Sequence, residues 1–212
     1  MLINSEFFSE LGKCIGVVQE FAPLEVVCYG IGSLATQISQ WQLALILLLN
    51  EHIGAPKILA FDPVTTESDI LTYTQVGISM IPVNEQAKRK AAIQTLFYMP
   101  HCGQVLYENV VSANWSLEQL SRIMLIGNSL QRYLDSQGEV EFAKRSPHIN
   151  CILPLVLCTE FPNEKLLKLR YGPYAFTDTC VQYIDPRKAE NVSFEPLPET
   201  DNTDNRSASS CC

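Results

Sequence analysis

The feature that most constrains this fold is a regular alternation of short apolar segments with longer helical ones. Five segments are apolar enough to form buried strands, at residues 25–30, 57–61, 78–83, 94–99 and 123–127. Segments of helical character follow them, at residues 35–52, 67–76, 85–92, 103–122 and 130–136. Strands covered on both faces need no polar–apolar alternation, and strands linked by helices pair in parallel through right-handed crossovers. The alternation therefore predicts an α/β protein with a mostly parallel central sheet.

The two ends of the sequence depart from this alternation. Residues 7–21 carry apolar side chains at helical spacing, which predicts an N-terminal helix that ends before Pro23. Residues 151–161 and 174–184 are both strand-like, and the proline- and glycine-containing loop between them favours an antiparallel connection. Five β/α units followed by such a strand pair is the order found in Rossmann-like methyltransferase folds. We therefore predict a three-layer Rossmann-like fold similar to the class I methyltransferase topology.

The composition fits one folded domain with a polar tail. Of the 212 residues, 47% are hydrophobic and 18% are charged, so the chain can bury a core and is not largely disordered. From Glu195 onward, proline, serine, asparagine and aspartate dominate, which predicts disorder. We expect a helix packed on the domain at residues 1–22, a Rossmann-type domain at 23–190 and a disordered acidic, serine-rich tail at 191–212.

The charge balance argues against one large class of partners. The chain has 15 basic and 23 acidic residues, a formal net charge of −8, whereas a polyanion-binding surface is basic. We therefore expect no direct nucleic-acid binding. The N-terminus lacks the pattern of a signal peptide, and the longest uninterrupted apolar run, residues 43–49, is too short to span a bilayer. These features predict no membrane span and a location in the cytoplasm and nucleus.

The cysteines favour free thiols over disulfides. Four of the eight lie inside or beside apolar runs: Cys28, Cys102, Cys151 and Cys158. Since no signal peptide is visible, we predict free, mostly buried thiols. The sequence contains no Cys-x-x-Cys, so we expect no metal site.

A double cysteine, Cys211 and Cys212, ends the sequence, as in small GTPases that are prenylated there. The phosphate-binding motif of those GTPases does not occur in the sequence. The pattern therefore does not favour prenylation.

The candidate ligand-binding residues follow from the predicted sheet, because open parallel sheets bind ligands at the carboxyl ends of their strands. They are Gly30, Gly32, Ser33, Asp62, Pro100, His101, Asn128 and Ser129. Gly30 and Gly32 allow a sharp turn and a close approach to a ligand, and nearby amides can face a phosphate or carboxylate. Asp62 follows the next strand, where a carboxylate can bind ribose hydroxyls. The same residues also fit a plain strand–helix turn with Asp62 as a cap, and both interpretations stay open.

Two further pairs at strand ends have structural interpretations as well. His101 and Cys102 join an acid–base group to a thiol, but adjacent residues on an extended chain point in opposite directions. A structural histidine beside a buried cysteine is therefore favoured over a catalytic pair. Asn128 and Ser129 either cap the following helix or bind a ligand, and capping is the favoured role. No catalytic constellation emerges from these residues.

Read together, these stretches resemble the sensitivity-to-red-light-reduced family, whose domain occurs across eukaryotes. The most distinctive are Thr-Leu-Phe-Tyr-Met-Pro-His-Cys at residues 95–102 and Ile-Gly-Asn-Ser at residues 126–129. Other matching stretches lie at residues 28–33, 42–45, 62–64, 84–85, 106–107, 113–115 and 175–178. The order and spacing cover residues 10–185.

The resemblance implies a regulatory protein, associated in this family with circadian clock input and control of heme biosynthesis. It names no protein partner and attaches no catalytic residue. We expect S-adenosylmethionine or a nucleotide at the strand ends, and heme at His101 and Cys102 is less favoured. The competing function is an active S-adenosylmethionine- or nucleotide-dependent enzyme. Met99 disfavours it, because amino-methylating enzymes of this fold place a polar residue there.

Overall fold

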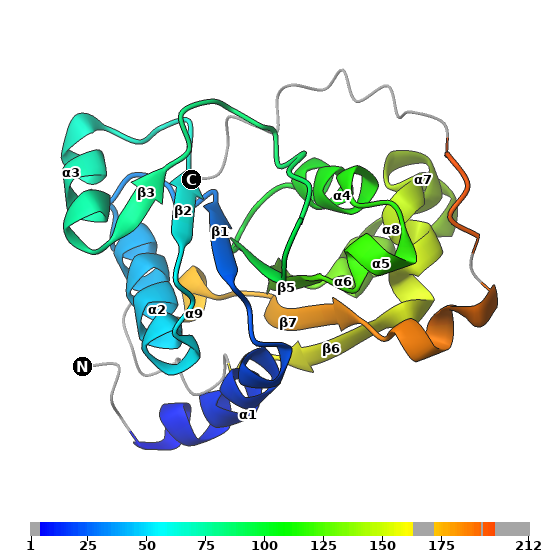
Figure 1. Cartoon of the computed structure of the whole chain (residues 1–212), viewed down its shortest axis with the longest axis horizontal. Helices are drawn as coiled ribbons and strands as arrows, with labels where there is room; N and C mark the ends of the chain where they lie inside the picture. Colours follow the sequence, from blue (N-terminus) through cyan, green and yellow to red (C-terminus); the bar gives the residue numbers. More distant parts are fainter. Residues whose placement is uncertain (1–4, 163–171, 192, 198–212) are drawn as a thin grey trace.

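A mixed β-sheet runs through the centre of the computed structural model, which describes residues 5–162, 172–191 and 193–197 (Figure 1). Within these residues the sheet has seven strands in the order β3-β2-β1-β4-β5-β7-β6. The strands are β1 (Glu25–Tyr29), β2 (Ile58–Phe61), β3 (Ile78–Met80), β4 (Thr95–Met99), β5 (Ile123–Asn128), β6 (Val156–Glu160) and β7 (Thr179–Ile184). The first five are parallel, and β7 is antiparallel to both β5 and β6. This is the class I methyltransferase order, so the predicted fold class is confirmed.

Helices cover both faces of the sheet and create two separate cores. The helices are α1 (Ser5–Phe21), α2 (Gln37–Ile53), α3 (Glu67–Gln75), α4 (Gln104–Ala113), α5 (Leu117–Leu120), α6 (Leu130–Gln137), α7 (Glu139–Arg145), α8 (Pro147–Ile152) and α9 (Gly172–Ala175), with the 3-10 turns Leu153–Leu155 and Pro186–Asn191. Buried side chains of α1, α2, α3 and α9 pack on one face, and those of α4 to α8 pack on the other. Every residue of β1 and β4 is buried, which explains why these strands show no alternation.

The helix predicted at residues 85–92 is wrong. Gln86 and Ala87 have φ angles of 50° and 58°, in the left-handed region, which interrupts a right-handed helix. The side chain of Asn114, at the end of α4, accepts a hydrogen bond from the Ala91 amide at 2.7 Å and donates one to the Arg89 carbonyl at 2.9 Å. A distant side chain therefore satisfies backbone groups that a local helix would have paired.

The two C-terminal strands begin later than predicted. Residues 151–155 belong to α8 and the following 3-10 turn, so β6 starts only at Val156. Pro147 starts α8, where its missing amide costs nothing, and the next two amides donate to the carboxylate of Glu108 at 3.0 Å each. Tyr174 lies in α9, so β7 starts only at Thr179. Apolar runs this short do not separate helix from strand by their pattern alone.

The last described residues dock onto the helical layer. Trp115 donates from its indole nitrogen to the Glu195 carbonyl at 2.8 Å, and its ring lies 5.3 Å from that of Phe194. Phe194 and Glu195, inside the range predicted as tail, are thus held against Trp115, just before α5. Cys211, Cys212 and the rest of the predicted tail beyond residue 197 lie outside the described residues.

Replacing Gly127 with alanine should destabilise the fold, because the added methyl group would overlap the Tyr107 hydroxyl and lie 2.7 Å from the Met99 carbonyl oxygen. We expect Gly127→Ala to lower the free energy of unfolding by about 1–3 kcal/mol, measured by urea denaturation. Gly16→Ala is the matched control, since this exposed position on α1 has free space. It should raise stability by roughly 0.5–1 kcal/mol, and equal effects at both positions would contradict the packing argument.

Candidate functional site

The loop after β1 and the end of β2 are joined by one carboxylate. Gly30 and Gly32 have φ angles of 72° and 82°, which only glycine adopts without strain. The Gly32 amide donates to Asp62 Oδ2 at 2.8 Å, and the Val64 amide donates to Oδ1 at 2.9 Å. Asp62 therefore holds the glycine loop against β2. Its bond to Val64, two residues further on, also caps the turn after β2, as the structural alternative predicts. The helix α3 itself is capped by the side chain of Thr66.

A second carboxylate, Asp69, supports the same loop and was not among the predicted site residues. Its Oδ1 accepts a hydrogen bond from the Leu34 amide at 3.1 Å. Its Oδ2 accepts hydrogen bonds from the amide and hydroxyl of Thr66, both at 2.9 Å, which completes a capping box at the start of α3. The signal in the sequence is the three-residue spacing between Thr66 and Asp69. That spacing predicts the cap, and only the tertiary structure brings Leu34 to it.

The environments of the two carboxylates push their pKa values in opposite directions. Burial raises the pKa of Asp62, and the Asp69 charge adds to this, against the opposing hydrogen bonds from Val64 and Gly32. Burial also acts to raise the pKa of Asp69, but hydrogen bonds from Thr66, Leu34 and Ser33 outweigh it and the pKa is lowered. Asp69 is therefore the carboxylate that stays ionised while it supports the loop. The hydrogen bonds to Asp62 do not fully offset the cost of burying its charge.

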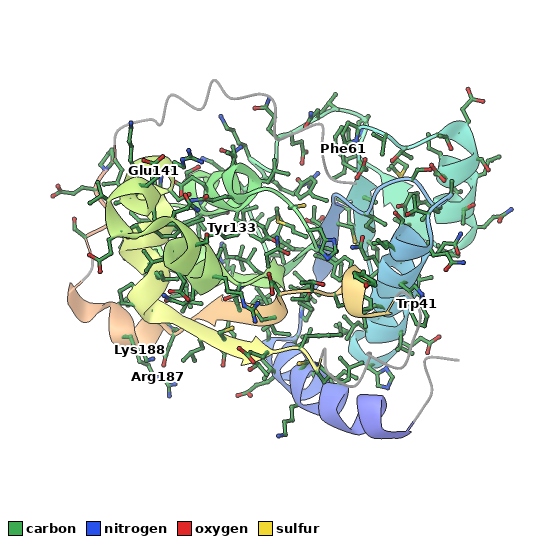
Figure 2. The ribbon with its side chains drawn as sticks, turned by 180° about the vertical axis from the view of Figure 1, so that it is seen from behind. Trp41, Phe61, Tyr133, Glu141, Arg187 and Lys188 are labelled. Atoms are coloured by element: carbon green, nitrogen blue, oxygen red, sulfur yellow. The ribbon has the colours of Figure 1, made fainter. Side chains whose placement is uncertain are left out.

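The ends of β4 and β5 are joined by the side chain of Asn128. Its Oδ1 accepts a hydrogen bond from the His101 amide at 3.0 Å, and its Nδ2 donates to the Cys102 carbonyl at 3.3 Å. The Tyr133 hydroxyl donates to the same carbonyl at 2.8 Å and accepts from Nδ2 at 2.9 Å. His101 itself has a φ of 59°, a strained conformation for this residue. Asn128 thus holds the loop after β4 in an unusual shape, together with Tyr133, which Figure 2 labels among the side chains of the helical layer.

The capping role predicted for Asn128 and Ser129 is wrong. Ser129 occupies the N-cap position of α6, but its side chain makes no capping hydrogen bond. The Leu130 amide instead donates to Gln182 Oε1 at 2.9 Å, from the neighbouring strand β7. The Ser129 amide donates to the Asp178 carbonyl at 3.0 Å. The start of α6 is therefore satisfied by residues distant in the sequence.

Tyr107, in the first half of α4, connects the ends of β4 and β5. It was not among the predicted site residues. Its hydroxyl donates to the Met99 carbonyl and accepts a hydrogen bond from the Asn128 amide at 2.8 Å. The ring is fully buried, and burial raises the pKa of Tyr107 well above its usual value. The hydroxyl therefore stays protonated and ties β4 to β5.

Cys102 and His101 differ in their surroundings. The Cys102 side chain is buried, and its thiol donates to the Tyr29 carbonyl at 3.3 Å, as the prediction of a buried cysteine requires. Burial lowers the pKa of the His101 imidazole, and the Asp178 carboxylate acts in the opposite direction. His101 is half-buried, and Pro100 before it is buried.

The eight predicted residues all lie along one edge of the sheet, in two groups. Gly30, Gly32, Ser33 and Asp62 form the group at β1 and β2, and Pro100, His101, Asn128 and Ser129 form the group at β4 and β5. Cys102 links the groups through its hydrogen bond to Tyr29. Over the described ranges, no three His, Cys, Asp or Glu side chains are arranged to hold a metal. Nor is any helix there both long and apolar enough to cross a membrane.

Removing the Tyr107 hydroxyl should destabilise the β4–β5 junction, because the Met99 carbonyl and the Asn128 amide would lose a shared buried partner. We expect Tyr107→Phe to lower the free energy of unfolding by about 1–3 kcal/mol, measured by denaturant titration. Tyr174→Phe is the control, since this tyrosine on α9 is largely exposed. An equal or larger loss in the control would contradict the assigned role of Tyr107.

Asp69 should contribute stability that depends on pH. Its folded pKa lies below the unfolded value of about 3.9, so its ionised form stabilises the fold above that pH. This contribution is lost as the pH falls through the folded pKa. Asp69→Asn should therefore be less stable than the wild type at neutral pH, and the difference should narrow below about pH 4. Urea titrations across this range measure the gap, and a constant gap would refute the role of the charge.

Comparison with known proteins identifies related sequences. A family model described as the SRR1 domain matches residues 14–183. Protein SENSITIVITY TO RED LIGHT REDUCED 1 of Arabidopsis thaliana is 42% identical over 113 residues, which cover 52% of this chain and 41% of that protein. An SRR1-like protein of Mus musculus is 38% identical over 112 residues, covering 51% of this chain and 45% of that protein. The matches therefore span less than half the length of these relatives.

Two solved structures share part of the architecture at low sequence identity. One, described as cmcI-N160 SAH, aligns with a TM-score of 0.46 at 12% identity, over 87% of this chain and 80% of that chain. The other, the 23S rRNA methyltransferase ErmE, aligns with a TM-score of 0.42 at 15% identity, over 88% and 70%. Similarities at this level support no assignment of activity.

Proposed function

Because the chain belongs to the SRR1 domain family, we propose that it is a regulatory protein that binds a nucleotide-like small molecule at the carboxyl edge of its sheet. The observation that carries this proposal is the position of Asp62. It stands at the end of β2 and bonds to the Gly32 amide of the glycine loop after β1. In Rossmann-like sheets, a carboxylate at this place binds the hydroxyls of a ribose.

The electrostatics of this corner support a neutral hydroxyl-bearing ligand group at Asp62. The amides of Gly32 and Leu34 already donate to Asp62 and Asp69, so neither of them is available to a phosphate. Asp62 accepts one hydrogen bond at each oxygen, and a carboxylate oxygen can accept a second. Donation from ribose hydroxyls would stabilise the charge that burial disfavours.

The loop after β4 supports a regulatory rather than a catalytic role. The Cys102 thiol donates to the Tyr29 carbonyl inside the core instead of facing the carboxyl edge. The side-chain amide of Asn128 makes its hydrogen bonds to the backbone of His101 and Cys102 and to the Tyr133 hydroxyl. These polar groups position backbone, and the left-handed His101 is the kind of strained residue that clusters at ligand sites.

The biological setting is proposed from the family resemblance. We place this regulator in circadian clock input and in the control of heme biosynthesis, in the cytoplasm and nucleus, acting on a protein partner. The name of the Arabidopsis relative refers to reduced sensitivity to red light, which concerns that protein and is compatible with a role in clock input. Imaging of the tagged chain tests the location, and proteins that co-purify with it from the same cells identify the partner.

A second candidate function is an S-adenosylmethionine- or nucleotide-dependent enzyme. The observation that favours it is the strand order β3-β2-β1-β4-β5-β7-β6, combined with an acid at the end of β2. Met99 ends β4 and is fully buried, so it brings no polar group to that position. Turnover of S-adenosylmethionine to S-adenosylhomocysteine by the pure chain distinguishes this function from binding alone.

Thermal unfolding with S-adenosylmethionine, S-adenosylhomocysteine and a panel of nucleotides tests the binding proposal. A ligand at about 100 times its dissociation constant stabilises by about 2.7 kcal/mol, which for a domain of this size raises the melting temperature by roughly 5–10 °C. Asp62→Asn keeps the side-chain shape and should abolish that shift. Asp135→Asn, an exposed carboxylate on α6, should keep it. No shift with any of these ligands in the wild type would overturn the proposal.

A further inference from the structure

Three cysteines gather where α1 meets the outer strands of the sheet. Cys14 lies on α1, Cys158 on β6 and Cys180 on β7. Cys14 and Cys180 are buried, whereas Cys158 is exposed, contrary to the buried thiol predicted for it. Figure 1 shows β6 at the border of the sheet with α1 beside it. An exposed thiol therefore lies next to buried ones at an accessible edge.

The register of β6 and β7 places Cys158 and Cys180 on the same face. Cys158 pairs directly with Gln182, and Cys180 precedes Gln182 by two positions on β7. Side chains two apart on a strand point to the same side, so the two cysteines are diagonal neighbours. Hydrogen bonding between the two thiols lowers the pKa of Cys158 and raises that of Cys180. The two side chains therefore approach each other from neighbouring strands in the reduced protein.

Cys14 is separated from this pair by the sheet. It packs in the same core as Val181, while the side chain of Gln182 points the other way and bonds to the Leu130 amide of α6. The Cys14 thiol donates to the Glu160 carbonyl at 3.6 Å. Burial, together with the nearby Cys158, raises the pKa of Cys14 to about 11. Cys14 is thus a protonated thiol on the opposite face and not the natural partner of Cys158.

The two paired thiols are electrostatically unequal. The hydrogen bond from Cys180 lowers the pKa of Cys158, and Arg132 lowers it further, against the effects of partial burial and Glu160. The same hydrogen bond raises the pKa of Cys180, and burial adds to this. The exposed thiol is therefore the one that ionises, and the buried thiol keeps its proton. Thiolate character and exposure are the properties that make a cysteine sensitive to oxidants.

We propose that Cys158 and Cys180 are a peroxide-responsive dithiol that closes to a disulfide between β6 and β7. The proposal does not depend on ligand binding at the carboxyl ends of β1, β2, β4 and β5. In it, Cys158 reacts with the oxidant, and Cys180 then forms the disulfide with the oxidised Cys158.

The reaction needs a hydroperoxide as oxidant and proceeds in two steps. The Cys158 thiolate attacks one peroxide oxygen, the O–O bond breaks, and the other oxygen leaves as hydroxide and takes up a proton to become water. This forms a sulfenic acid on Cys158. The Cys180 sulfur then attacks the Cys158 sulfur, the S–O bond breaks, and the hydroxyl leaves as water with the proton from Cys180. The two thiols lose two electrons and two protons in total, and hydrogen peroxide is reduced to two waters.

Closing the disulfide changes the contacts of β5 as well. While Cys158 is protonated, the single S–H of Cys180 donates to the Gly127 carbonyl at 3.7 Å. A disulfide has no S–H group, so this hydrogen bond is lost on oxidation. Cys180 pairs directly with Gly127 in the sheet, beside the junction that Tyr107 holds. Oxidation of Cys158 and Cys180 therefore also removes a contact of β5, the strand that ends at Asn128.

Peptide mapping of the full chain, treated with hydrogen peroxide and kept non-reduced, tests the proposal. We expect a Cys158–Cys180 linkage in the wild type that dithiothreitol reverses. Cys180→Ser should instead accumulate a sulfenic acid on Cys158, trapped by dimedone, while Cys158→Ser should form neither product at Cys180. Cys151→Ser is the matched control, because this partly exposed thiol on α8 should not take part.

The rate of alkylation tests the reactivity of Cys158 separately from disulfide formation. Two thiols that only fill space would give Cys158 no faster alkylation than another partly exposed cysteine. Burial raises the pKa of Cys151, whereas the pKa of Cys158 is lowered, so Cys158 should react with iodoacetamide faster than Cys151 at neutral pH because more of it is thiolate. Its rate should also reach half of its maximum at a lower pH. A linkage through Cys14 or Cys151, no linkage in the wild type, or faster alkylation of Cys151 than of Cys158 would each overturn the proposal. Because the linkage and rate are measured on the wild type, they remain decisive if a variant at buried Cys180 does not fold.

Discussion

The structure depends on side chains that satisfy the backbone where the parallel strands end. A strand loses its hydrogen-bonding neighbour as it turns into a helix, and a sheet covered on both faces has little water nearby to replace it. Here Asp62 serves the loop after β1, Asn128 serves the loop after β4, and the hydroxyl of Tyr107 bridges β4 and β5. These contacts cross between elements. The shape of the carboxyl edge is therefore a property of the folded sheet and not of any single loop.

The sequence allowed the layers of the fold to be predicted more fully than the details of the edge. The parallel order and the antiparallel final pair follow from the alternation of apolar runs, because burial on both faces leaves a pattern that one sequence displays. The segment at residues 85–92 failed for a different reason. Its backbone groups at Arg89 and Ala91 bond to the side chain of Asn114 at the end of α4. The local sequence of residues 85–92 gives no sign of this distant partner. The late start of β6 has the same origin, since Glu108 of α4 accepts the first amides of α8.

The candidate residues show the same division. Strand ends are visible in the sequence, so Asp62, His101 and Asn128 were found, yet their contacts were not. Asn128 was expected to serve the helix that follows it, but it reaches back to His101 on the preceding unit. Asp69 and Tyr107 were missed because each looks like an ordinary helix residue until the neighbouring loop or strand is placed beside it. The pairing of Cys158 with Cys180 likewise depends on the register of two strands, which the sequence does not display.

Gly127 and Tyr107 occupy one space between them. The tyrosine hydroxyl lies where a side chain on residue 127 would begin, so the hydrogen bonds to Met99 and Asn128 exist only because that side chain is missing. The two positions are therefore coupled, and substitutions at both should not have additive effects on stability. Shortening residue 107 would relieve only part of the crowding, because the Met99 carbonyl oxygen would still lie 2.7 Å from a side chain at residue 127. The backbone of β4 thus limits residue 127 to glycine on one side, as the tyrosine does on the other.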